Sequence, residues 1–139
     1  MIAAANRLRR HGEYQRVYRS SRKRFGKQMS YFFLLRESQS TTESSVLAGS
    51  ISGPRVGLTV SRAMGKAVVR NRIKRRMRQA VRRNIAMLQA PVDVVLHPNR
   101  RVTEIEFAVL EQDVAQVFRA IQQSVEREAR ARISAGERL

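Results

Sequence analysis

Residues 55–79 read RVGLTVSRAMGKAVVRNRIKRRMRQ, and this stretch decides the fold. Its first six residues alternate between the two sides of an extended chain, which predicts a strand. A turn around Gly65 leads into a helix that should end near Leu88, because Pro91 cannot continue it. Residues 92–97 predict another strand, so the two strands and the helix between them form a β-α-β unit.

The predicted helix has two faces of opposite character. Apolar residues recur at helical steps and form a core-facing stripe: Val69, Ile73, Met77, Ala80, Val81, Ile85 and Leu88. Basic residues spaced four apart form the other face, namely Lys66, Arg70, Lys74 and Arg78, and Arg72, Arg75, Arg76, Arg82 and Arg83 widen it. An ordinary solvated face carries charges of both signs, whereas this face carries one. We therefore interpret it as a surface for a polyanion, with nucleic acid as the leading candidate.

Positive charge is concentrated in the first two-thirds of the chain. The 139 residues carry a net charge of +17. Residues 1–36 hold ten Lys and Arg against Glu13 alone, and residues 55–92 hold eleven with no acid, whereas residues 93–139 are nearly neutral. A basic helix on a membrane surface could carry similar charge, but it would need large apolar side chains exposed opposite the charges. Trp is absent, and the apolar stripe is expected to pack against the protein core, which argues against the membrane alternative.

The rest of the chain predicts two more helices, one more strand and several irregular segments. A basic arm over residues 1–11 leads into a short helix, and residues 28–36 alternate as a strand. Residues 38–54 are rich in Ser, Thr and Gly, which predicts a flexible loop. A long amphipathic helix begins at about residues 103–107, and the tail over residues 133–139 should fray.

The resulting order is helix-strand-strand-helix-strand-helix within a single domain spanning residues 1–139. Such an order predicts the α+β class, as a two-layer α/β sandwich in which helices pack on one small sheet with a βαβ crossover. There is no cysteine, no apolar run of membrane-spanning length and no secretory signal, so we expect a cytoplasmic protein.

The sequence offers few residues for catalysis. Its two histidines, His11 and His97, lie far apart, and each has a structural explanation at the end of a predicted element. Asp93 and Asp113 are the two aspartates, and no group of carboxylates converges in the pattern of a metal-dependent nuclease. We therefore expect that the protein alone catalyses nothing.

Six aromatic residues lie in the basic N-terminal third of the chain: Tyr14, Tyr18, Phe25, Tyr31, Phe32 and Phe33. Aromatic rings among Arg and Lys can stack on unpaired bases, or they can fill a core. The alternation of their strand favours the core for Tyr31 and Phe33. For Tyr14, Tyr18 and Phe32 the pattern leaves both interpretations open, and it assigns no role to Phe25.

Three segments resemble those of a known family. Residues 65–75 read GKAVVRNRIKR and contain an Arg-Asn-Arg signature at positions 70–72. Residues 55–61, RVGLTVS, and residues 6–18, NRLRRHGEYQRVY, match the preceding strand and the first helix. Over about residues 6–125 the chain resembles the bacterial ribonuclease P protein subunit. The resemblance implies a fold like the second domain of a small-subunit ribosomal protein.

The resemblance also implies a function: a non-catalytic protein subunit that assists an RNA enzyme in removing the 5′ leader of precursor tRNA. The expected partners are the catalytic ribonuclease P RNA and precursor tRNA, without a membrane or a protein partner. Mg²⁺, held mainly by the RNA, is the expected cofactor, and Asn71 could help to hold a hydrated metal ion that is shared with RNA phosphate.

Two groups of residues correspond to the binding surfaces of the family. Together with the basic face, the resemblance assigns the catalytic RNA to Arg62, Lys66, Arg70, Asn71, Arg72, Lys74, Arg75 and Arg78. The leader would lie in a cleft between the first helix and the sheet, lined by Tyr14, Val17, Tyr18, Ser30 and Phe32.

The sequence departs from the family pattern at three places. Ala63 replaces a frequent lysine, Ser30 replaces a branched apolar residue, and residues 38–53 form an insertion without an assigned role. Two other functions remain open at this point. One is a general or ribosomal RNA-binding protein of the same fold, and the other is a protein-only nuclease.

Overall fold

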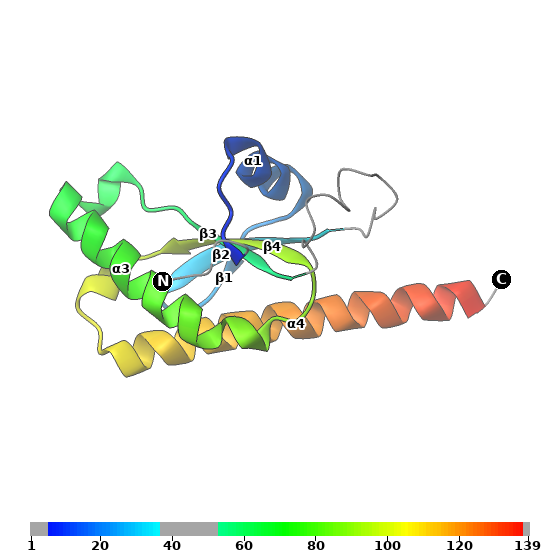
Figure 1. Cartoon of the computed structure of the whole chain (residues 1–139). Coiled ribbons are helices and arrows are strands. Elements are labelled where there is room, and N and C mark those ends of the chain that lie inside the picture. The colour runs from blue at the N-terminus through cyan, green and yellow to red at the C-terminus, as the bar shows by residue number, and fades with distance from the viewer. Residues whose placement is uncertain (1–5, 37–52, 138–139) are drawn as a thin grey trace.

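The computed structural model describes residues 6–36 and 53–137 (Figure 1). Three α-helices span His11–Ser20 (α1), Ala67–Asn84 (α3) and Phe107–Glu137 (α4). Four strands span Arg24–Phe25 (β1), Met29–Leu35 (β2), Arg55–Leu58 (β3) and Val92–Pro98 (β4). Short 3₁₀ turns cover Arg62–Met64, Ile85–Met87 and Arg100–Thr103. None of the described helices is both long and apolar enough to cross a membrane.

The strands form one sheet in the order β1-β2-β4-β3. β3 pairs with β4 in parallel, and the other two pairings are antiparallel. The parallel pair is connected through α3, which confirms the β-α-β unit and the α+β class.

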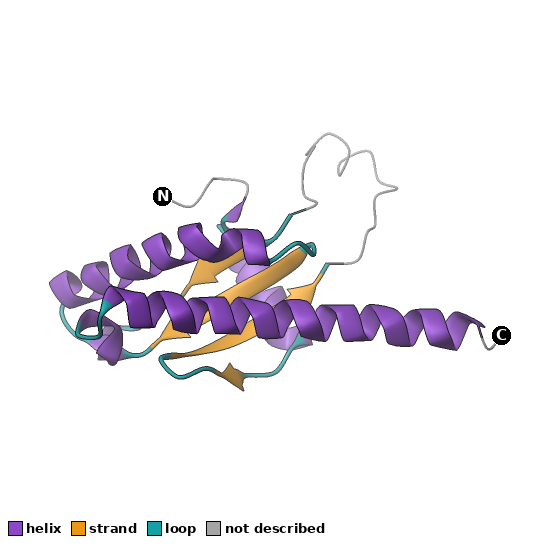
Figure 2. Ribbon diagram, turned by 90° about the horizontal axis from the view of Figure 1, so that it is seen from below, coloured by secondary structure: helices purple, strands orange, loops and turns teal. Residues whose placement is uncertain are grey.

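α3 and α4 cover one face of the sheet, where they lie side by side (Figure 2). The main core lies between this helix layer and the sheet. The apolar stripe of α3 faces it as predicted: Ile73, Met77, Ala80, Val81 and the following Leu88 are buried, and Val69 and Ile85 pack against them partly exposed.

α1 lies on the opposite face of the sheet (Figure 1). Strand alternation explains how one sheet supplies both faces, because Tyr31 and Phe33 join the main core while Phe32 and Leu34 pack with α1. The second, smaller core contains Leu8, Val17 and Val95. The predicted sandwich of helices on a sheet is therefore completed by a partial third layer, which the sequence pattern did not predict.

The structure adds one strand to the prediction and defines the start of α4. β1 was not predicted, because a strand of two residues has no detectable period. α4 begins at Phe107, at the later end of the expected range, because residues 100–103 form a 3₁₀ turn in which the Thr103 hydroxyl donates to the Arg100 carbonyl. The structure describes α4 to Glu137, and the fraying of residues 133–139 stays a prediction.

The two irregular segments lie largely outside the described residues. Of the predicted flexible loop over residues 38–54, the structure describes Gly53 and Pro54. Of the predicted basic arm, residues 6–10 are described, and they are attached to the sheet: Arg7 forms a parallel bridge with Val56, and the Leu8 side chain is buried.

Candidate nucleic-acid interface

A fixed turn positions the start of the basic helix. Gly65 has a φ of 136°, a conformation that side chains other than glycine rarely adopt. Its N–H donates to the Arg62 carbonyl, and its own carbonyl accepts a hydrogen bond from Arg70 Nε at 3.2 Å. The chain thus leaves β3, passes the Arg62–Met64 turn and enters α3. The hydrogen bond to Gly65 keeps the Arg70 side chain close to this turn.

The residues predicted to bind the catalytic RNA are accessible. Arg62, Lys66, Asn71, Arg72, Arg75 and Arg78 are exposed, and Arg70 and Lys74 are half-buried. Within the described ranges, no carboxylate lies within 4.0 Å of their charged groups, since every ion pair there involves other residues. The face therefore presents uncompensated positive charge to solvent, as the sequence predicted.

Two of the arginines that the sequence placed on this basic face instead contact other parts of the protein. Arg76 donates to the carbonyl of Ile105, and Arg83 pairs with Glu111 at 3.4 Å while its guanidinium lies over the Phe107 ring. Both connect α3 to α4 or to the segment before it. Further along α3, Arg75, Arg78, Gln79 and Arg82 line a shallow basic groove.

The face of the sheet under α1 carries three cross-strand rows of side chains. Strand register defines them, because directly paired residues point to the same face. The first row contains Phe25, Ser30 and His97, and Thr59 extends it beyond β3; the second contains Phe32, Val95 and Gly57; the third contains Leu34, Asp93 and Arg55. The Thr59 N–H donates to the Leu96 carbonyl at 3.0 Å, which places Thr59 beside His97.

Tyr18, Phe32 and His97 form an aromatic cluster at the first two rows. The Tyr18 ring meets Phe32 edge-on with centroids 5.0 Å apart, and the His97 ring lies 5.8 Å from Tyr18 and 5.5 Å from Phe32. The Tyr18 hydroxyl is 3.0 Å from His97 Nε2 and 3.3 Å from the Thr59 hydroxyl. Burial, together with the charge of Lys23, lowers the pKa of His97 below its ordinary 6.5, so the imidazole is neutral at pH 7.

The structure brings four of the five predicted leader residues to this face as half-buried side chains, namely Tyr14, Tyr18, Ser30 and Phe32. Val17 differs, because it is fully buried in the core with Leu8 and Val95. A direct contact between Val17 and RNA would require α1 to move. Its role in the free protein is to hold α1 on the sheet.

Tyr14 packs directly on the backbone of β3. A Cβ atom at Gly57 would lie 2.5 Å from the Tyr14 hydroxyl and 2.6 Å from the ring carbon that carries it. The absence of a side chain at Gly57 therefore lets α1 approach the sheet closely, and the tyrosine ring fills the space.

Replacing Gly57 by Ala is expected to destabilise the fold by about 1–3 kcal/mol, because the new methyl group overpacks this contact. Urea unfolding measures the change. Gly12→Ala in α1 is the matched control, because a Cβ there meets nothing within 4 Å. Equal losses of stability from both substitutions would contradict the proposed packing.

A buried carboxylate connects α1 to the sheet. Asp93 has no exposed surface, and it accepts from Arg55 Nε and Nη2 at 2.8 Å each, from Arg36, and from Arg16 of α1 at 3.3 Å. Arg55 also pairs with Glu13 of α1. Burial alone would raise the pKa of Asp93, but the hydrogen bonds and charges of Arg55 and Arg36 outweigh it and hold that pKa below its ordinary value.

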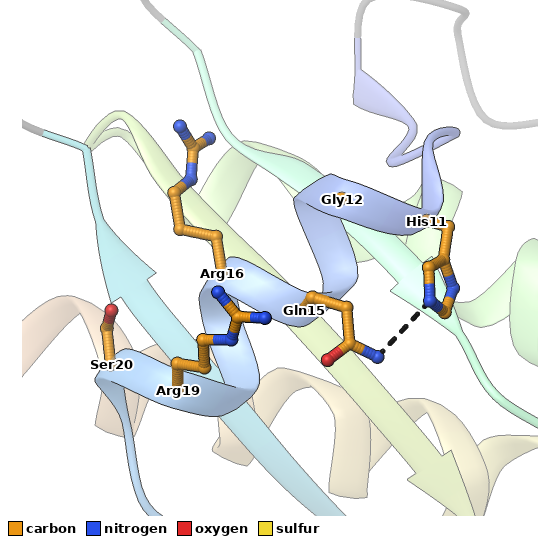
Figure 3. A pocket seen from close by; sticks show the side chains of 6 residues that line it. All are labelled: His11, Gly12, Gln15, Arg16, Arg19 and Ser20. Carbon is orange, nitrogen blue, oxygen red and sulfur yellow. Dashed lines mark hydrogen bonds between the residues drawn. The ribbon is translucent and has the colours of Figure 1, made fainter.

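The outer face of α1 forms a second basic surface. His11, Gly12, Gln15, Arg16, Arg19 and Ser20 line a shallow pocket there (Figure 3). His11 and Gln15 contact each other at 3.4 Å, one helical turn apart. Arg19 is exposed beside Arg16, so cationic groups lie on this side of the molecule as well as on α3.

Sequence reasoning missed three residues of the site. His97 and Thr59 complete the aromatic cluster, and Asp93 anchors α1. The sequence pattern identified each of them only as a strand residue. The available signal was the alternation of Asp93, Val95 and His97, which predicts one shared face of β4. The residues that they contact are 38 to 79 positions away in sequence, so the pattern could not identify the partners.

The described side chains do not fit a magnesium site made by protein alone. No group of three His, Asp or Glu residues comes together in the described ranges. Asn71 offers one exposed amide oxygen, but its neighbours Arg70 and Arg72 are cations. Mg²⁺ prefers several oxygen ligands, so Asn71 could contribute only where another molecule supplies the remaining ligands.

Comparisons with known proteins agree on one family. The family model described as Ribonuclease P matches residues 2–122. The Ribonuclease P protein component of Maridesulfovibrio salexigens is 35% identical over 111 residues, which cover 78% of this chain and 81% of the relative. That of Thermobifida fusca is 29% identical over 121 residues, covering 87% and 79%. The RNase P protein of Staphylococcus aureus has the same fold, with a TM-score of 0.65, 19% identity and coverage of 84% of this chain and 95% of that structure.

Proposed function

The chain belongs to the ribonuclease P protein family, and from this premise we propose that α3 binds the catalytic RNA while the α1 face binds the 5′ leader of precursor tRNA. Membership makes the protein a tRNA-processing subunit of an endoribonuclease complex with an RNA partner. In our proposal the RNA component performs the hydrolysis, and the protein positions the substrate.

The uncompensated charge of α3 supports the first assignment. A helix keeps its cations at fixed positions, and neutralising RNA phosphates with them releases counterions, which gives an affinity that falls steeply with salt. Asn71 lies within this face. We propose that its amide oxygen can join the hydration sphere of a Mg²⁺ ion that RNA phosphates hold.

The aromatic cluster carries the second assignment. Half-buried rings cannot reach bases that are stacked inside a duplex, but an unpaired base can be laid against them. Such recognition suits a single-stranded leader, which precursor tRNA has and mature tRNA lacks. The protein would then favour the substrate over the product.

Continuity of the chain supports placing both RNA segments next to each other. Thr59 contacts Tyr18 in the aromatic cluster, and three residues later Arg62 begins the basic segment. A leader bound across the α1 face would therefore meet the catalytic RNA at the β3 edge of the sheet.

Replacing Tyr18 by Ala is expected to weaken the binding of precursor tRNA to the reconstituted holoenzyme about tenfold, because stacking on an aromatic side chain contributes about 1–3 kcal/mol per base. Binding of mature tRNA should change little. Tyr18→Phe is the matched control, since it keeps the ring and removes the hydroxyl that contacts His97 and Thr59.

Equilibrium titrations with the two RNAs, alongside precursor cleavage at low Mg²⁺, measure these effects. Equal losses for precursor and mature tRNA would reject the leader assignment. The RNA-free protein with Mg²⁺ should leave the precursor intact, and cleavage under those conditions would favour a protein-only nuclease.

A further inference from the structure

Phe25 is a large apolar side chain that neither core uses. It is 77% exposed, and it lies on β1, the edge strand of the sheet. Its backbone pairs with Ser30 of β2, so its ring leaves the sheet on the face that carries α1. Arg24 points to the other face, where its guanidinium lies 4.8 Å from the centroid of the Phe33 ring.

Phe25 continues the first cross-strand row to the edge of the sheet. The row runs from Thr59 through His97 and Ser30 to Phe25. Neighbouring strands are about 4.8 Å apart, so Phe25 lies about 10 Å from His97 across two strand spacings. The β3 end of the row leads into the basic segment, and Phe25 occupies the opposite end.

A firmly attached turn holds Phe25 in this position. The Gly26 N–H donates to the Met29 carbonyl at 2.7 Å and closes the turn between β1 and β2. The backbone N–H groups of Lys27 and Gln28 donate to the two carboxylate oxygens of Asp113 on α4, at 3.2 and 2.7 Å. These contacts fix the backbone beside Phe25 before any ligand arrives, which lowers the entropic cost of binding through this residue.

The surroundings of the Phe25 ring are cationic. The Lys23 ammonium lies 5.6 Å from the ring centroid, and Arg22 and Lys27 are exposed close by in the chain. Single exposed apolar residues are common on protein surfaces. An aromatic ring among cations, in line with a row of candidate RNA-binding residues, is an arrangement that proteins use to bind single-stranded nucleic acid.

We propose that Phe25 stacks on one further unpaired nucleotide of the leader, on the side of the aromatic cluster away from the basic helix. This inference rests on the proposed function, because it extends the same leader site across the sheet to β1. Lys23 neutralises the adjacent phosphate. The leader therefore has to reach a minimum length before it gains this contact.

Holoenzymes reconstituted with the full-length chain test the inference with precursor tRNAs whose leaders increase one nucleotide at a time. With the unaltered protein, affinity should rise when the leader becomes long enough to reach Phe25. Phe25→Ala should remove that rise, which corresponds to a loss of about five- to tenfold, and should leave shorter leaders and mature tRNA unaffected. Phe25→Trp should retain the rise, because it keeps an aromatic face.

A fluorescent base provides a second measurement. When 2-aminopurine occupies the leader position that produces the rise, stacking on Phe25 should quench its emission, and Phe25→Ala should restore it. Val109→Ala is the matched control, since Val109 is an exposed apolar residue of α4 on the other side of the sheet. It should change neither signal.

The outcomes separate this inference from the function on which it rests. If Tyr18→Ala weakens leader binding and Phe25→Ala does not, the leader site stands and the role of Phe25 is refuted. If Phe25→Ala weakens binding at every leader length and for mature tRNA, Phe25 contacts another part of the RNA and the inference is overturned. If neither substitution distinguishes precursor from mature tRNA, the leader assignment itself fails.

Discussion

Replacing Lys66, Arg70 and Lys74 together by Gln is expected to weaken the binding of catalytic RNA about a hundredfold at about 0.1 M salt. Each lost phosphate contact reduces the slope of log affinity against log salt by about 0.7–0.9, so three contacts reduce it by about 2–3. Glutamine is polar and uncharged and has a similar helix propensity, so the change removes charge with little effect on the helix. RNA titrations at several salt concentrations measure both the affinity and the slope.

A charge-matched variant separates a local contact from the overall attraction of a basic protein. Arg119, Arg127 and Arg130 are exposed on α4, and their replacement by Gln removes the same net charge. This control should leave the slope nearly unchanged. Equal reductions in both variants would mean that total charge governs binding, and the assignment of the catalytic RNA to α3 would then be wrong. Thermal unfolding of both variants verifies that the fold is intact.

Asp93→Asn is expected to destabilise the fold by about 3–5 kcal/mol, the usual cost of removing one partner from a buried ion pair. The substitution keeps the shape of the side chain but leaves Arg36 and Arg55, which are largely buried, without their common counter-charge. A single domain has only about 5–15 kcal/mol of stability in total. Urea unfolding measures the loss, and detachment of α1 should also impair leader binding.

An exposed ion pair serves as the control for Asp93. Glu111→Gln removes a carboxylate that pairs with Arg83 at 3.4 Å at the protein surface, and it should cost about 0–1 kcal/mol. A loss at Asp93 no larger than the loss at Glu111 would show that the network around Asp93 contributes little to stability.

The pH dependence of stability provides an independent check on Asp93. The folded protein holds the pKa of Asp93 below its ordinary 3.8, so the carboxylate contributes stability that is fully present above that pH. The contribution is lost as the pH falls from about 3.8 towards the lowered value. The Asn variant lacks it at every pH, so its unfolding free energy should depend less on pH in this acidic range.

Helical and strand periodicity predicted the elements that pack as layers. The stripe from Val69 to Leu88 identified the buried face of α3, and alternation identified the two faces of β2. The same reasoning failed for β1, whose two residues gain their structure from pairing with β2. Periodicity of buried residues is also a weak guide beyond Val125, because residues 126–131 of α4 are exposed and Arg130 pairs there with Glu126 one helical turn away.

The two candidate binding surfaces also differ in how far the sequence predicts them. The basic face of α3 is local in sequence, so its spacing was sufficient to predict it. The aromatic cluster depends on strand register, which brings His97 to Tyr18 across 79 positions. Resemblance to a family predicted Tyr18 and Phe32, but only the structure shows that His97 joins them and that Val17 of α1 is buried against the sheet.

The absence of acidic residues from α3 has a consequence for the free protein. Arginine and lysine one helical turn apart repel each other, and the helix itself contains no carboxylate that would offset the repulsion. Dissolved ions screen that repulsion, so raising the ionic strength favours the folded chain. The same ions compete with the protein for RNA phosphates and weaken the complex. Ionic strength therefore has opposite effects on the folding stability of the free subunit and on the stability of its RNA complex. The free subunit is least stable in the dilute buffers in which it binds RNA most tightly.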